Sequence, residues 1–213
     1  MAQSTGFMKN MVAEQKRRLS DEVYFLTGNT APVNGTSGTG KDVAGPGSTY
    51  TNTATGIVYV NIGTKASPSW APASGEVTIS LTSAQVKALR ATPITMVPAA
   101  GAGLVVQFLG AELLLDYGGT NVFTEVADNL AFRYVNGTGV IVSQTVETTG
   151  FIDQAGDVIT NAMPKIDAIA TKAQSENVAL VLHNTGAAEI AGNAANNNVV
   201  RVKVRYAMVA TGW

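Results

Sequence analysis

The sequence has no cysteine among its 213 residues, which excludes disulfide bridges, iron–sulfur clusters and thiolate metal sites. Charge is also scarce, because Asp, Glu, Lys and Arg make up 14% of the chain, against about 25% in soluble domains generally. So few charges are typical of a protein whose surface is covered by copies of itself or by a partner. The formal net charge of -1 argues neither for nor against nucleic acid.

Long hydrophobic runs are also missing at both ends of the sequence. The first residues, MAQSTGFMKNMVAEQKRRLSDEV, are too polar for a signal peptide or a membrane span. We therefore expect a chain made in a cytoplasm without a signal peptide, and no membrane as a partner.

What the sequence does have is short, β-branched apolar runs separated by Gly, Pro or Asn, and these predict a mainly β protein. Three regions can be distinguished. Residues 1–26 predict an N-terminal arm with a short amphipathic helix. Residues 27–74 predict a small glycine-rich β-hairpin region, and residues 75–213 predict a sandwich-like or jelly-roll-like body.

The arm contains the one charge-dense helical pattern. Its apolar side chains share one face of the predicted helix, and its basic side chains lie elsewhere. A detached arm that contacts a partner and a helix folded back on its own sheet have the same pattern, so both interpretations stay open. The proposed contact residues of the arm are Phe7, Met8, Met11, Lys16, Arg17 and Arg18.

The second region contains one clear hairpin, STYTNTATGIVYVNIG. Tyr50 and Tyr59 bracket the turn NTATG, in which a glycine can supply a positive φ angle. Trp70 follows in KASPSWAP, where the prolines keep the backbone extended. We predict that these three aromatic side chains make contacts with a partner.

The body begins with the alternating strand EVTISLT and continues with further strand-like runs such as VVRVKVRYAMVA, for about seven or eight strands in all. Residues 83–92 predict one or two helical turns, which start at a Ser cap and stop before Pro93. Residues 153–173 predict an excursion with some helix, which Pro164 should break.

A nucleotide site is suggested by NGTSGTGKDVAGP, where Gly35, Gly40 and Lys41 have the spacing of a phosphate-binding loop. Such a loop joins a buried strand to a helix, but TGNTAPVN precedes it and the glycines and proline of DVAGPG forbid a helix. Asp42 also places a negative charge where Ser or Thr is required. We therefore predict a flexible or close-packed glycine-rich connector between the arm and the hairpin, which supplies reach and mobility and binds no phosphate.

Other catalytic patterns are weak, so we predict no enzyme, no cofactor and no metal. His183 has no Ser–acid pair beside it in the sequence. Asp153, Asp157 and Asp167 lack the spacing of a calcium loop. A hydrolase that uses Asp153 and Asp157 remains a hypothesis that requires the two carboxylates to converge in a cleft.

Arg201, Lys203 and Arg205 alternate with apolar residues and form a basic stripe on one face of a predicted strand. The stripe is either a contact for an acidic protein surface or glycan, or the solvent side of an edge strand. Nucleic-acid binding would need more basic residues and interleaved aromatics, so we predict no nucleic-acid partner.

Two stretches resemble proteins of tailed-bacteriophage virions. Gly45 to Trp70, GPGSTYTNTATGIVYVNIGTKASPSW, is similar to the short glycine-and-tyrosine hairpin unit of phage head-fibre and tail-fibre proteins. Leu81 to Val106, LTSAQVKALRATPITMVPAAGAGLVV, with LLLDYGGTNVF after it, resembles a segment of small phage structural proteins. Together these stretches cover less than half of the chain.

The resemblance implies a trimeric, β-rich virion protein without enzymatic activity. In a capsid decoration (cement) protein, burial at the joints between capsid subunits adds binding energy that resists the internal pressure of the DNA. The arm would reach onto the major capsid protein, and the body would form the homotrimer. The main rival is a tail-fibre or baseplate module that binds a host-surface glycan through Tyr50, Tyr59 and Trp70, although fibres are usually longer and more repetitive.

Overall fold

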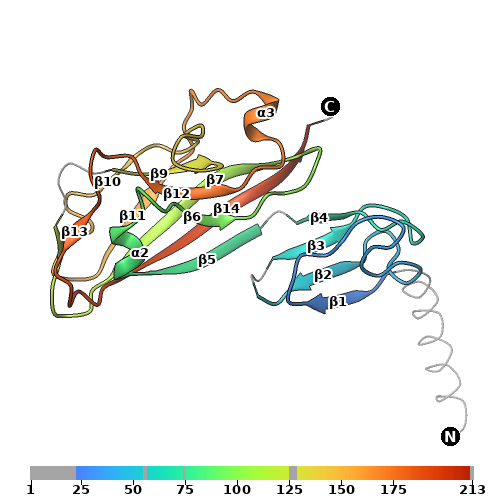
Figure 1. Cartoon of the computed structure of the whole chain (residues 1–213), viewed down its shortest axis with the longest axis horizontal. Coiled ribbons are helices and arrows are strands. Elements are labelled where there is room, and N and C mark those ends of the chain that lie inside the picture. Colours follow the sequence, from blue (N-terminus) through green and yellow to red (C-terminus); the bar gives the residue numbers. More distant parts are fainter. Residues whose placement is uncertain (1–22, 55–56, 74, 125–128, 212–213) are drawn as a thin grey trace, which may run out of the picture. The chain divides into compact units, whose positions relative to one another are not determined.

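The computed structural model of the chain describes residues 23–54, 57–73, 75–124 and 129–211. The chain divides into two compact units, Met1–Ala73 and Ser74–Trp213, called unit 1 and unit 2 below (Figure 1). Each described unit consists mainly of β-strands, as predicted. The helix predicted within residues 1–26 lies outside the described residues.

Unit 1 contains one four-stranded sheet in the order β1-β2-β3-β4. The central strands β2 and β3 form the predicted hairpin, with Thr49 opposite Val60 and Thr51 opposite Val58. Strand β1 runs parallel to β2, and the other neighbours are antiparallel. The four strands are β1 (Phe25–Gly28), β2 (Thr49–Asn52), β3 (Val58–Asn61) and β4 (Trp70–Pro72).

The predicted boundary after residue 26 is corrected by this sheet, because it cuts through β1. FLTG is too short and too mixed in polarity to signal a strand locally. It becomes one by parallel pairing with residues 49–52, more than twenty positions away. Long-range pairing of this kind leaves no periodic signal in the sequence.

Unit 2 contains two four-stranded antiparallel sheets and a two-stranded one. The strand orders are β10-β9-β12-β6, β11-β7-β14-β5 and β13-β8. A jelly-roll arrangement stays a prediction. The strands are β5 (Gly75–Thr82), β6 (Ile94–Val97), β7 (Leu104–Asp116), β8 (Phe123–Thr124), β9 (Asn129–Tyr134), β10 (Val146–Glu147), β11 (Val158–Ala162), β12 (Leu180–Asn184), β13 (Ala191–Gly192) and β14 (Val199–Ala210).

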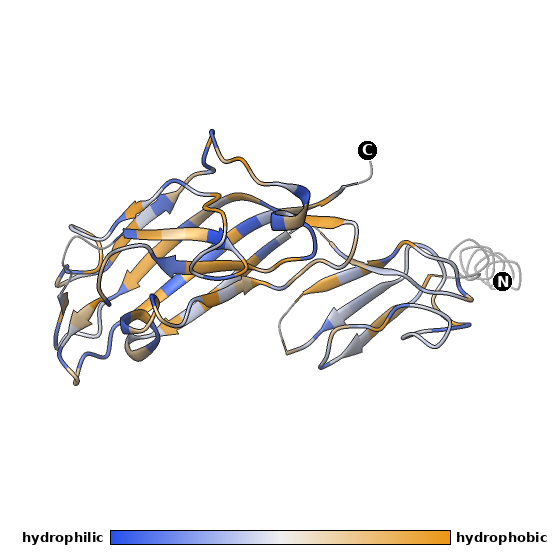
Figure 2. Cartoon of the chain, turned by 45° about the horizontal axis from the view of Figure 1, so that its top comes forward, coloured by the Kyte–Doolittle hydropathy of each residue, from blue (hydrophilic) through white to orange (hydrophobic). Residues whose placement is uncertain are grey.

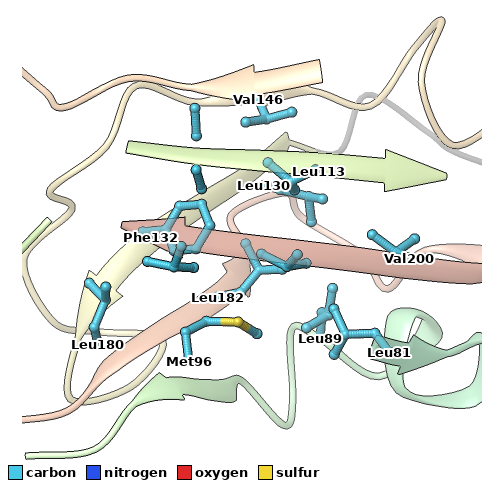
Figure 3. Close-up of a cluster of buried hydrophobic side chains, with 14 of the residues drawn as sticks. Leu81, Leu89, Met96, Leu113, Leu130, Phe132, Val146, Leu180, Leu182 and Val200 are labelled. Atoms are coloured by element: carbon cyan, nitrogen blue, oxygen red, sulfur yellow. The ribbon is translucent and has the colours of Figure 1, made fainter. Parts of the chain in front are cut away.

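The two large sheets of unit 2 share one hydrophobic core (Figure 3). Along the long strands buried residues alternate with more exposed ones, and the ribbon colours show hydrophobic and hydrophilic residues in alternation (Figure 2). Phe108 of β7 stacks on Phe132 of β9 with ring centroids 4.7 Å apart, which joins the two sheets across the core. Fully buried members include Leu81, Met96, Leu113, Leu130, Leu180, Leu182, Val200 and Val202.

Two short helices connect these strands. Helix α2 (Ser83–Lys87) confirms the helical turn predicted there, but its N-cap is Thr82, whose hydroxyl accepts a hydrogen bond from the Gln85 backbone N–H. Helix α3 (Lys172–Ser175) lies at the end of the predicted excursion. The remainder of that excursion contains β11, so the prediction of helix is wrong there: β11 pairs with β7 along its whole length.

Candidate binding surfaces

The glycine-rich segment before β2 packs over one face of the unit 1 sheet. An added Cβ at Gly40, whose φ is 74°, would lie 2.8 Å from the Cβ of Ala44 and 3.5 Å from the Trp70 ring. The Trp70 indole N–H donates to the Thr39 carbonyl at 2.9 Å, and the Asn61 side chain donates to the Ala44 carbonyl at 2.6 Å. The predicted reach and mobility of this segment are therefore wrong: close packing requires its glycine.

The loop that spells a phosphate-binding motif uses its backbone N–H groups internally. Gly35 N–H donates to the Pro68 carbonyl at 2.8 Å, and Asp42 N–H donates to the Lys65 carbonyl at 2.9 Å. The Lys41 ammonium lies 3.5 Å from the Asp42 carboxylate. Turns follow the loop where a nucleotide site needs a helix. These groups hold the loop to its own unit.

The aromatic side chains predicted to contact a partner are instead the core of unit 1. Tyr50, Tyr59 and Trp70 are 5%, 7% and 4% exposed. The Tyr50 ring packs against both others, at centroid distances of 6.3 Å and 5.9 Å. Burial raises the pKa of the Tyr59 hydroxyl, with a smaller contribution from Tyr50. A glycan platform needs exposed rings, so the predicted contact role is corrected to a packing role.

The opposite face of the same sheet carries no charge, and its residues are partly or well exposed. Its residues alternate along each strand with the buried ones, so they point away from the aromatic core. The registers place them in two rows across the four strands. This uncharged face consists of Phe25, Thr27, Thr49, Thr51, Val58, Val60, Ala71 and Ala73.

Exposure and composition both set this surface apart. Phe25 is 83% exposed and Val58 is 38% exposed. Between residues 23 and 73 the sequence has only three charged side chains, Lys41, Asp42 and Lys65, and none belongs to a strand. Residues 23–73 are therefore much poorer in charge than the chain as a whole.

The predicted basic stripe lies on the outer face of a unit 2 sheet, but it is paired with acids. The guanidinium of Arg201 binds the Asp116 carboxylate, and that of Arg205 lies 2.5 Å from Glu112. Glu76 lies within 3.7 Å of Lys203 and within 3.5 Å of Arg205. We call these six side chains the ion-paired face.

This pairing corrects both interpretations of the stripe. Strand β14 is hydrogen-bonded on both sides, to β7 and to β5, so it is a central strand and not an edge. Its three cations face three carboxylates on those neighbours, which leaves no net positive surface for an acidic partner. The acids come from distant strands, so no local pattern marks them.

A loop between β11 and α3, residues 163–170, exposes large apolar side chains. Ile166 is 97% exposed, Ile169 is 87% exposed and Met163 is 57% exposed. The loop also borders a cleft of about 530 Å³, which is lined by Val105, Phe108, Tyr134, Val142, Ala168, Ala170 and Val209 among others. We call residues 163–170 the apolar loop. Clustered, fully exposed isoleucines are typical of a protein–protein contact.

His183 is nearly buried in β12, at 5% exposure. Its Nδ1 lies 3.4 Å from the Arg133 guanidinium, and a Cβ at Gly137 would come within 2.6 Å of its Nε2. Burial and the nearby Arg133 charge lower the pKa of the imidazole, although a backbone hydrogen bond with Arg90 acts in the opposite direction. The ring is thus a neutral, packed member of the sheet.

The carboxylates of the hydrolase hypothesis each hold a turn. Asp153 accepts from the Gly150 backbone N–H at 2.8 Å, Asp157 accepts from the Tyr117 backbone N–H at 2.9 Å, and Asp167 pairs with Lys165 at 3.1 Å. Among the described residues, no group of three or more His, Asp or Glu side chains is arranged to hold a metal ion. Nor does any helix in the described ranges have the length and apolar character to cross a bilayer.

The predicted arm contacts Phe7, Met8, Met11, Lys16, Arg17 and Arg18 all lie outside the described residues. Sequence reasoning missed the uncharged face and the apolar loop. Threonine spacing in FLTG and STYTN was the available signal for the first, and MPKIDAIA carried the isoleucines of the second. The uncharged face was hidden because a strand pattern shows alternation but not which set of residues is covered. The apolar loop was hidden because residues 153–173 were predicted to contain some helix.

Comparison with known proteins does not assign a family to the chain. No protein-family model matches the chain, and no curated protein sequence matches it. A chain of the "Structure of infectious bursal disease virus Gx strain" is similar at 13% identity and a TM-score of 0.19. The match covers 75% of this chain and 47% of the viral chain. A TM-score of this size carries no argument about fold or function.

Proposed function

We propose that this protein is a structural component of a tailed-bacteriophage virion: a trimeric capsid decoration (cement) protein that binds across the joints between capsid subunits and stabilises the head. The proposal combines the resemblance of residues 45–70, 81–106 and 113–123 to phage structural proteins with the surfaces described above. Its function is binding, and it needs no cofactor.

The observation that carries the proposal is the apolar loop. Full exposure of Ile166 and Ile169 leaves two large apolar side chains in water, and burying each one against a partner is worth about 1.5–3 kcal/mol. The loop borders a cleft whose lining combines apolar side chains with polar ones such as Lys165 and Lys172, so a partner can cover both at once. We assign this surface of unit 2 to the contact between copies in the homotrimer.

The titratable groups support binding in preference to catalysis. His183 is buried between Arg133 and a backbone loop, and Asp153 and Asp157 each accept hydrogen bonds from the backbone. In these places they stabilise the fold of unit 2. The predicted arm, residues 1–26, keeps its role as the contact to the major capsid protein.

The test of the decoration role uses capsids of the phage whose genome encodes the chain, assembled without it. We expect the full chain to sediment with these capsids at many equivalent positions and to raise their disruption temperature, because a ligand that binds only the intact shell stabilises it. A chain without residues 1–18 should lose capsid binding. Absence of binding by the full chain would overturn the decoration role.

The trimer is tested separately by light scattering of the full chain in solution. We expect a trimer, and a shift toward monomer in an Ile166→Ser, Ile169→Ser double variant. Ile159→Ser is the matched control, because Ile159 is also well exposed, at 67%, but lies on β11 away from the apolar loop. Equal effects of the loop variant and the control would contradict the assignment of the loop.

The tail-fibre or baseplate alternative predicts a different location. Its proposed glycan contacts Tyr50, Tyr59 and Trp70 are buried, which removes the observation that favoured it. Quantitative mass spectrometry of purified virions distinguishes the two roles, because decoration requires copies over the whole shell and a tail module requires few copies at one vertex.

A further inference from the structure

Residues 135–139 follow β9 and form a turn, which we call the cover turn. It lies against the outer face of the sheet β10-β9-β12-β6, where Arg133 and His183 alternate with core residues along β9 and β12. The His183 ring is buried although this face points away from the shared core. A Cβ at Gly137 would lie 2.6 Å from Nε2 of His183, so the cover turn is one of the segments that bury the ring.

The cover turn is strained at Val135. The φ angle of this residue is 67°, a value that β-branched residues rarely adopt. The Asn136 backbone N–H donates to the Tyr134 carbonyl at 2.8 Å, and a bond of this span around a positive φ is the rare, strained form of the γ-turn. The Val135 side chain is 49% exposed, so its own packing does little to offset the strain. Contacts made by other residues must hold the turn in this form.

The side chain of Arg133 makes such contacts. Its Nε donates to the Gly139 carbonyl at 3.0 Å, and its Nη1 donates to the Gly137 carbonyl. Nη1 also lies 3.4 Å from Nδ1 of His183. That nitrogen can accept a hydrogen bond only while the ring is neutral, because both nitrogens of a protonated imidazole are donors. The neutral ring therefore supports the guanidinium in the position from which it holds the cover turn.

Three charged groups act on the His183 ring: Arg133 of β9, Arg90 after α2, and Glu189 in the loop between β12 and β13. The Glu189 carboxylate is engaged by the backbone, because it accepts from the N–H groups of Arg90 at 3.0 Å and Ala91 at 2.7 Å. The two other groups are cations. A proton on His183 therefore places a second positive charge 3.4 Å from the Arg133 guanidinium.

We propose that acid releases the cover turn: protonation of His183 displaces the Arg133 guanidinium from the carbonyls of Gly137 and Gly139, and the turn opens. Strand β12 is a central strand, so the backbone of His183 is fixed by its neighbours, whereas the long side chain of Arg133 can swing into water. Opening also relieves the strain at Val135. This device belongs to unit 2 alone and does not rest on the decoration role or on the homotrimer.

The pH range of the opening follows from the histidine. Burial and then the Arg133 charge lower the pKa of the covered ring below its ordinary value of 6.5. An uncovered ring in water binds a proton more readily, so the open form gains population as the pH falls below about 6.5. Opening removes one wall of a cleft of about 540 Å³, which residues 137–138 line together with residues 187–189.

Hydrogen exchange of the full chain, followed by mass spectrometry at about pH 7.5 and about pH 5, tests the device when each rate is divided by the intrinsic rate at that pH. We expect the protection of residues 135–139 to fall by about tenfold at the lower pH. The protection of β14 should not change, because the core stays folded. Equal protection of the cover turn at both pH values, or an equal loss in β14, would overturn the proposal.

Two variants test the parts of the device separately, and thermal unfolding at about pH 7.5 verifies that each one folds. His183→Gln does not titrate, so the cover turn should be equally protected at both pH values. Val135→Gly retains the histidine but removes the strain, because glycine adopts a positive φ freely. It should keep more of its protection in acid than the unaltered chain. A cover turn that still opens in acid in His183→Gln would overturn the role of this ring, and equal or greater opening in Val135→Gly would overturn the role of strain.

Discussion

Unit 1 and unit 2 both use β-sheets, but they cover those sheets in different ways. In unit 2 each large sheet covers the other, and the shared core runs through both. Unit 1 has a single sheet, and its own glycine-rich loop covers one face over the aromatic core of Tyr50, Tyr59 and Trp70. Its second face remains open. The loops of unit 1 cover one face of its sheet, and the other face carries no charge.

The outer sheet faces of the two units also differ in charge. The ion-paired face of unit 2 carries three cations and three carboxylates in register on β5, β7 and β14. Charges placed in this way keep a β-surface hydrated and discourage sheet-to-sheet contact. The uncharged face of unit 1 lacks that protection. The ion-paired face is therefore suited to water, and the uncharged face is suited to contact with an uncharged surface.

The largest effect that separates the units is expected from Trp70→Ala. Removing a buried Trp costs about 3–5 kcal/mol, and a unit of about 50 residues has only about 3–7 kcal/mol of stability at roughly 0.05–0.15 kcal/mol per residue. We expect unit 1 to unfold while unit 2 stays folded. Hydrogen exchange followed by mass spectrometry measures each unit through its own peptides.

The counterpart in unit 2 is Phe132→Ala, which removes the ring stacked on Phe108. The loss is of the same size, but the larger core of unit 2 should remain folded with a lower melting temperature. If Trp70→Ala abolished protection in both units together, the two would not be independent folding units.

The next effect is a pH dependence confined to unit 2. Because the folded-state pKa of His183 lies below the ordinary value of 6.5, the unfolded chain binds the proton more readily. Stability is therefore complete above about pH 6.5 and falls as the pH decreases toward the folded-state pKa. Thermal unfolding of unit 2 at a series of pH values should show this loss.

His183→Gln is the matched variant, because it keeps a polar side chain opposite Arg133 but does not titrate. We expect a flatter pH dependence of the melting temperature than in the unaltered chain. The melting of unit 1, which has no histidine, should not change between the two proteins. An unchanged slope in the variant would show that another group causes the dependence.

The smallest effect is expected on the ion-paired face. Arg205→Ala removes contacts with Glu76 and Glu112, but exposed ion pairs contribute only about 0–1 kcal/mol each. Denaturant unfolding should show a loss in that range, which shrinks as salt is added. A loss of several kcal/mol would mean that the face is buried against a partner in solution.

Much of the fold could be predicted from particular residues. EVTISLT and the two long runs around residues 104–116 and 199–210 were predicted as strands, and the structure places them side by side in one sheet. The hairpin around NTATG was predicted with its turn. These segments have a clear alternation or a clear turn signal, so local patterning was sufficient.

The sites were predicted less well, for a physical reason that recurs. Tyr50, Tyr59 and Trp70 are amphipathic and suit both a core and a binding surface, and Gly40 suits both a flexible and a tightly packed loop. Arg201 and Arg205 were predicted to belong to a free basic stripe. In the structure they pair with Asp116 and Glu112 of β7. The chemistry of each residue was clear from the sequence. Its role was not, because the residues that contact it come from segments far away in the sequence.

By itself, the sequence determined that this protein is built of short strands, contains no thiol chemistry, has little charge and has a glycine-rich region near its start. These properties follow from residue type and local spacing. Only the tertiary structure decided which face of each sheet is covered, which charges are neutralised and which isoleucines remain in water. Those properties depend on long-range strand pairing, because a strand shows the same alternation whichever of its two faces is buried.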